Sequence, residues 1–127
     1  MLFTRVLDVV GESFQAHAKL AGFYMGEGRV QEAEAHALKA LSLNSGAAEA
    51  NAMMGVVLAA KKDFSGAERA FRVVLSKYPG DARMLNNLGY IREQQGRLEE
   101  ARQLFAAAMK ADPNLYTVRE NLKRVGG

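Results

Sequence analysis

The residues of this chain whose types could support chemistry are two histidines and a glycine-rich stretch. His17 and His36 fall on two different helical segments, and neither has a carboxylate partner at a spacing typical of a metal or catalytic site. The stretch Gly22–Gly28 resembles a phosphate-binding loop only superficially, because it follows a helical segment and lacks the subsequent Lys and Ser/Thr. The sequence therefore predicts no catalytic residue, no cofactor site and no metal site.

Two pairs of acidic residues are the remaining candidates for acid–base chemistry. Glu32 with Glu34, and Glu99 with Glu100, fall on the expected outer faces of helices, where a carboxylate normally meets water. We therefore expect a protein without enzymatic activity.

Composition restricts the class of protein further. The 127 residues are 49% hydrophobic and 24% charged, as in one compact globular domain. Only two prolines occur, and Ala, Leu, Glu, Arg and Lys favour helix. The absence of cysteine excludes disulfides and thiolate metal sites, and leaves the compartment open.

Dispersed charge argues against nucleic-acid binding, and the first ten residues argue against a membrane span. The net charge of +3 is dispersed, whereas nucleic-acid binding needs a clustered basic face. The basic residues Arg119, Lys123 and Arg124 fall near the end of the last predicted helix. We interpret them as cations that interact favourably with the negative end of the helix dipole. Residues 1–10 read as neither a signal peptide nor a membrane span.

The chain repeats itself with a period of about 34 residues, as the related stretches that begin at Ala21, Gly55 and Gly89 show. Consecutive units fit without a gap: Phe14–Ala47, Ala48–Asp81 and Ala82–Leu115. Two apolar segments flank a polar turn in each unit, which predicts a helical hairpin.

Certain side chains recur at fixed places in the three units. Small residues mark the contact between the two helices of each hairpin: Ala21, Gly55 and Gly89 on the first helix, and Ala33, Ala67 and Ala101 on the second. Large apolar residues fill the layer around them: Leu20, Met54, Leu88, Leu41, Leu75 and Met109. The units end at Ser45, Pro79 and Pro113, where proline stops a helix.

These positions, together with the motifs Asn87–Tyr90, Glu100–Phe105 and Asp112–Asn114, resemble the tetratricopeptide repeat over residues 14–115. The pentatricopeptide repeat is the competing interpretation, but its unit is longer by one residue and its proline position fits less well. Departures from the family pattern are His17, Asn51 and Leu85 in place of tryptophan, Ala37 in place of a large residue, Ser45 in place of proline, and Arg92 in place of an aromatic.

The resemblance implies an all-α fold, a right-handed α-solenoid of helix-turn-helix repeats, whose first helices line a groove for peptides or partner helices. Helical geometry places six positions of each first helix on the face that packing leaves free. The candidate binding residues on these faces and on the last helix are Ala52, Met53, Val56, Arg83, Asn86, Asn87, Tyr90, Asn121 and Arg124.

We expect a peptide to bury an apolar side chain near Met53 and Val56, while Asn87 and Asn121 bond its backbone and Arg83 binds an acid. The competing interpretation is that the small residues at these positions let neighbouring first helices pack, with Met53 and Val56 mostly covered. Some family members bind acidic chaperone C-termini through basic and Asn side chains. The corresponding places here hold Ala18, Gly22 and Met53, with only Arg83 retained, so that ligand is not expected.

Both ends of the chain are expected to be helical. Residues 116–127 resemble a capping helix with one apolar and one polar side. Residues 1–13 resemble the second helix of a preceding repeat whose first helix is missing. Either this helix caps the N-terminal face of the array, or the chain is a piece of a longer array. An apolar strip around Leu2, Val6 and Val9 predicts weak self-association.

The sequence therefore favours a protein-interaction scaffold that binds a protein or peptide partner, does not bind nucleic acid and has no membrane span. The Ala-, Gly- and Arg-rich composition without cysteine is typical of bacteria, where comparable short arrays serve pilus assembly and secretion. The alternative function is a structural unit that stacks through its terminal helices.

Overall fold

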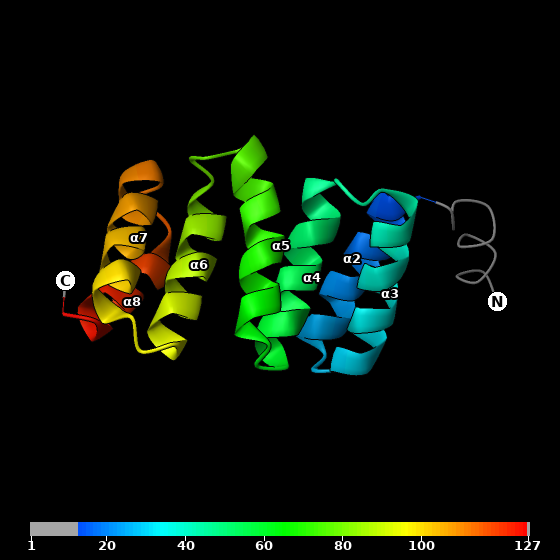
Figure 1. Cartoon of the computed structure of the whole chain (residues 1–127), viewed down its shortest axis with the longest axis horizontal. Helices are drawn as coiled ribbons and strands as arrows, with labels where there is room; N and C mark the ends of the chain where they lie inside the picture. The colour runs from blue at the N-terminus through cyan, green and yellow to red at the C-terminus, as the bar shows by residue number, and fades with distance from the viewer. Residues whose placement is uncertain (1–12, 127) are drawn as a thin grey trace. The chain divides into compact units, whose positions relative to one another are not determined.

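The protein is described by a computed structural model over residues 13–126 (Figure 1). The helices of this range are α2 (Phe14–Gly26), α3 (Val30–Leu43), α4 (Ala48–Ala60), α5 (Phe64–Lys77), α6 (Ala82–Gln94), α7 (Leu98–Ala111) and α8 (Tyr116–Arg124). No strand occurs within these residues, and none of their helices is long and apolar enough to cross a membrane. The helix expected within residues 1–13, with its strip around Leu2, Val6 and Val9, lies outside the described residues apart from Ser13.

The helices follow the repeat period of the sequence. Helices α2, α4 and α6 begin at Phe14, Ala48 and Ala82, and α3, α5 and α7 begin at Val30, Phe64 and Leu98. Side-chain caps begin two first helices: Ser13 accepts from the amide of Ala16, and Asp81 from that of Met84. The chain also divides into two compact units, each larger than one repeat, and the division falls within α5 between Val73 and Val74. The first unit is the N-terminal one and the second unit the C-terminal one.

The turns inside the hairpins share one backbone feature. Gly28, Lys62 and Gly96 occupy equivalent places in successive repeats and have φ of 74°, 66° and 77°. Glycine adopts this left-handed conformation freely, whereas a residue with a Cβ does so at a cost. Lys62 therefore holds the same turn as its two glycine counterparts under local strain.

Packing in the first unit joins α2, α3 and α4 through small side chains. Ala21, Ala33 and Ala37 are fully buried and form one cluster with the buried Met54 and Val57. The Ala37 side chain occupies the place where the family carries a large residue, so α2 and α3 meet here through alanines.

The later hairpins bring a glycine against an aromatic ring instead. A Cβ built on Gly55 would lie 2.4 Å from a ring atom of Phe71, and one on Gly89 would lie 2.6 Å from a ring atom of Phe105. Both distances are below any real Cβ contact, so hydrogen is the side chain that fits. The glycines therefore mark a close helix contact, as the sequence predicts, and the group that approaches them is a phenylalanine ring.

Packing in the second unit covers the end of the described chain. Val118 of α8 is fully buried with Ala101, Phe105 and Ala108 of α7. Leu122 packs against the same cluster, while the intervening Arg119 and Glu120 are exposed. Helix α8 therefore presents an apolar side to α7 and a polar side to water, which is the arrangement expected of a capping helix.

Two buried polar residues, Asn51 and Arg92, stand where the family carries aromatic residues, and both form polar bonds. The buried Asn51 donates from Nδ2 to the carbonyl oxygens of Ser45 (3.0 Å) and Ala47 (2.9 Å). It thereby satisfies the backbone of the loop that lacks the usual proline. Arg92 is buried and pairs with Glu100, its Nε lying 3.0 Å from a carboxylate oxygen.

Candidate functional site

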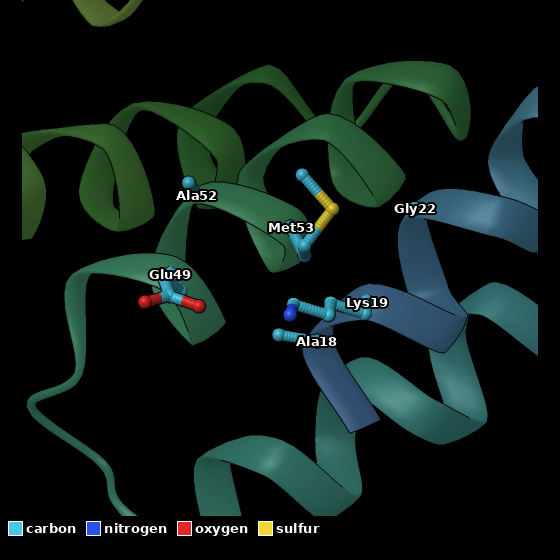
Figure 2. A pocket seen from close by; sticks show the side chains of 6 residues that line it. All are labelled: Ala18, Lys19, Gly22, Glu49, Ala52 and Met53. Carbon is cyan, nitrogen blue, oxygen red and sulfur yellow. The ribbon is translucent and has the colours of Figure 1, made fainter. Parts of the chain in front are cut away.

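The first unit holds a pocket of about 280 Å³ between α2 and α4. The residues that line it come from both helices: Ala18, Lys19, Gly22, Glu49, Ala52 and Met53 (Figure 2). All of them belong to the faces that the helical repeat leaves free. The structure therefore brings two of the predicted binding residues, Ala52 and Met53, into one concave site.

Small side chains create this hollow. Ala18, Gly22 and Ala52 contribute no more than a methyl group each, and Met53 extends from α4 toward Gly22 of α2 (Figure 2). A Cβ on Gly22 would lie 3.4 Å from the sulfur of Met53, an ordinary contact distance. The pocket wall is thus almost entirely apolar, and its charges belong to Lys19 and Glu49.

The burial of Met53 and Val56 bears on both interpretations of this face. Met53 packs against two buried clusters and is half-buried, and Val56 is also half-buried. Met53 therefore serves both as core and as pocket wall, while Val56 does not line the pocket. Neither side chain is fully covered within the first unit.

The second unit carries the polar part of the predicted set on α6 and α8. Asn121 donates from Nδ2 to Oδ1 of Asn86 at 2.8 Å. Arg124 binds both carboxylate oxygens of Glu93 at 2.6 Å and also reaches Oδ1 of Asn121 at 2.9 Å. These bonds tie α8 to α6, so Asn121 and Arg124 already have partners within the unit.

The electrostatics of the Glu93–Arg124 pair follow from the same bonds. Hydrogen bonding by Arg124 lowers the pKa of the Glu93 carboxyl, against the opposing effect of burial. The same bond raises the pKa of Arg124. Both groups are therefore held in their charged forms at neutral pH.

Three predicted residues of α6 have side chains available for a partner. Arg83 and Tyr90 are exposed. Asn87 is half-buried, and its amide makes no hydrogen bond to another described side chain. Arg83 and Asn87 are one helical turn apart, so both point to the same side of α6.

The structure also brings together the two histidines, which sequence reasoning had not paired. His17 of α2 and His36 of α3 stack with ring centroids 5.3 Å apart, and their Nδ1 atoms lie 3.0 Å apart. Tyr24 also stacks on His36, with ring centroids 5.5 Å apart. A bond between two Nδ1 atoms requires that one carries a proton and the other does not. No group of three metal-ligating residues occurs in the described range.

The histidine contact gives a pH prediction for stability. Burial is the main cause that lowers the pKa of His36 from 6.5, His17 adds repulsion, and Glu32 opposes both. Because the unfolded chain binds this proton more readily, the stabilisation is present above about pH 6.5 and is lost as the pH falls through the lower folded pKa. We expect the melting temperature to fall between pH 8 and pH 5 by less in His36→Gln than in the wild type. An identical fall in both proteins would contradict the prediction.

Comparisons with known proteins agree with the repeat. Sequence profiles described as tetratricopeptide repeat match residues 14–46 and 52–115. The chain belongs to the tetratricopeptide repeat family. Its all-α tetratricopeptide fold, expected from the sequence, is thereby confirmed.

One relative within this family is the type IV pilus assembly protein PilF of Pseudomonas aeruginosa, which is 31% identical over 113 residues. That alignment covers 87% of this chain and 45% of PilF. A solved structure from a functional characterisation of the same protein has a TM-score of 0.79 and covers 91% of this chain and 53% of its own. The chain therefore spans about half of the length of PilF.

More distant structures share the tetratricopeptide fold. The first such domain of RPAP3, solved with the HSP90 peptide SRMEEVD, has a TM-score of 0.80 and 16% identity, and covers 89% of this chain and 90% of that one. An O-GlcNAc transferase of Thermobaculum terrenum has a TM-score of 0.84 and 20% identity, and the match covers 88% of this chain and 22% of the transferase. At these identities the likeness concerns the fold alone.

Proposed function

We propose that this chain is a non-enzymatic interaction module that binds a peptide or partner helix on the free faces of its first helices. The observation that carries the proposal is the apolar pocket between α2 and α4. A concave apolar site with a charged rim is typical of a binding site, because apolar surface left in water is costly unless a partner covers it. The polar face of α6, with Arg83 and Asn87, is proposed as a second contact surface.

The chemistry of the pocket argues against an acidic clamp as its ligand-binding mode. Ala18, Gly22 and Met53 occupy the three places where chaperone-binding relatives would carry basic or amide groups, and all three line the apolar pocket. The HSP90 peptide of the RPAP3 complex is therefore not proposed as a ligand. A partner with an apolar anchor suits the site better.

We further propose that the partner belongs to a pilus or secretion assembly. The support is the 31% identity to the pilus assembly protein PilF, over 45% of that protein. The repeat boundaries 14–47, 48–81 and 82–115, with 1–13 and 116–127 as terminal helices, are part of the same proposal. Stacking through the terminal helices remains the alternative function.

The experiment that tests the binding site compares two alanine-to-leucine variants. A peptide selected on the purified chain from a displayed library is titrated calorimetrically into the wild type, Ala52→Leu and Ala107→Leu. Ala52→Leu fills the pocket and should weaken binding at least tenfold, which is about 1.4 kcal/mol. Ala107 is an exposed alanine of α7, so its variant should bind as the wild type does.

The α6 surface is tested separately with Asn87→Ala. This variant should weaken the binding of a peptide whose backbone forms hydrogen bonds with Asn87. Melting temperatures of all variants serve as folding controls. Normal binding by Ala52→Leu at an unchanged melting temperature would show that the pocket is not the site.

A further inference from the structure

The rim of the pocket in the first unit carries one charge of each sign. Lys19 lies on α2 and Glu49 on α4, and both side chains are exposed (Figure 2). Neither makes a hydrogen bond or ion pair with another described residue. Some charges of the neighbouring helices are paired, for example Lys61 with Glu34 at 2.7 Å and Arg29 with Glu32. The rim charges therefore remain available for a ligand.

The size of the pocket limits what it can take. Its volume of about 280 Å³ lies at the lower end of the usual range of small-molecule sites, roughly 300 to 1,000 Å³. The walls offer no polar side chain apart from the rim charges. A side chain of a polypeptide fits these limits, and a hydrophilic cofactor does not. The flexible thioether of Met53 can adjust to the shape of an aliphatic group.

Resting on the proposed function, we infer that the pocket selects a peptide segment in which one aliphatic side chain is flanked by an acidic residue on one side and a basic residue on the other. The aliphatic group enters between α2 and α4. The acid lies toward Lys19 and the base toward Glu49. Charges at such a rim contribute to specificity more than to affinity, because they penalise a ligand of the wrong sign.

The position of Glu49 has a second physical role, which the test must separate from this one. Glu49 is the acidic residue in the first turn of α4, where a carboxylate favours the positive end of the helix dipole. That role affects the stability of α4 and does not depend on the charge of any ligand. A reversal of ligand preference therefore distinguishes specificity from stability.

The test uses capped heptapeptides of Gly and Ala with a central Leu, titrated to millimolar concentration into the isotope-labelled full chain. In the mixed Leu peptide the Leu lies between Glu and Lys, and in the two peptides of single charge it lies between two Glu or between two Lys. A fourth peptide, the Ser peptide, has Ser in place of Leu between Glu and Lys. Amide shifts of Gly22 and Ala52 report binding. The wild type should bind the mixed Leu peptide about threefold to tenfold more tightly than either peptide of single charge.

Variants with altered rim charges should reverse this order. Lys19→Glu should prefer the peptide with two Lys, and Glu49→Lys the peptide with two Glu. The double variant Lys19→Glu/Glu49→Lys should again prefer the mixed peptide. Lys39→Glu changes an exposed charge of α3 that does not line the pocket. It matches the change in net charge of Lys19→Glu and should keep the wild-type order.

The outcomes separate this inference from the proposed function. If the Leu peptides bind better than the Ser peptide and Ala52→Leu weakens them, but all charge patterns bind alike, the pocket stands and the selection by charge is wrong. If Leu and Ser bind alike and Ala52→Leu has no effect, the pocket itself is not the site. The absence of any shift with the mixed peptide would also overturn the inference.

Discussion

Gly89→Ala is expected to lower the free energy of unfolding by about 1 to 3 kcal/mol, although alanine is the better helix former. The new Cβ would lie 2.6 and 2.7 Å from two ring atoms of Phe105. That ring is fully buried and is confined by Ala101, Ala108 and Val118. Either the ring or the α6–α7 spacing must shift, and both changes reduce packing.

Urea denaturation of the wild type and its variants checks this expectation. Gly26→Ala is the matched control, because Gly26 is the last residue of α2 and a Cβ there would meet nothing within 4 Å. Its stability should be unchanged or slightly raised. In a Phe105→Leu background the cost of Gly89→Ala should shrink, since the atoms that clash are ring atoms. Equal effects of the two glycine substitutions would show that close packing is not the cause.

The repeat made the helices predictable from the sequence. A constant period fixes equivalent positions, and the small, apolar and proline positions within it indicate where helices meet and end. The observed helix starts at Phe14, Ala48 and Ala82 follow this period because equivalent residues pack in the same way in each repeat. The contact of Gly55 and Gly89 with phenylalanine rings was harder to predict from the sequence. The alanines on the same second helices recur just as regularly as the phenylalanines and were equally good candidates for the contact.

The candidate site was predictable in its faces and not in its bonds. Helical geometry alone selected the side of α4 that carries Ala52 and Met53, since backbone direction determines which residues share a face. Side-chain partners on different helices depend on rotamers and on residues that do not repeat. The bonds of Asn121 and Arg124 to α6 and the stacking of His17 on His36 are of this kind. No periodic signal in the sequence could have indicated them.

Glu100→Gln is the second substitution with a large expected effect, a loss of about 1 to 3 kcal/mol in the free energy of unfolding. Arg92 is 4% exposed, and its guanidinium lies 3.0 Å from the Glu100 carboxylate, with a further bond of 3.2 Å to Gln95. A buried cation that loses its counter-charge keeps the cost of desolvation without the attraction that offsets it. The amide of glutamine restores a hydrogen bond at most.

The neighbouring glutamate provides the control for this experiment. Glu99 pairs with Arg102 on the exposed side of α7, so Glu99→Gln should cost between 0 and about 1 kcal/mol. Arg92→Met removes the buried charge itself and should change stability less than Glu100→Gln does, because an apolar side chain of similar length suits a buried site. Thermal and urea unfolding of the three variants decide the point. If Glu100→Gln proves as mild as Glu99→Gln, the remaining bonds of Arg92 are sufficient to hold its charge, and the place where the family carries an aromatic tolerates arginine without this ion pair.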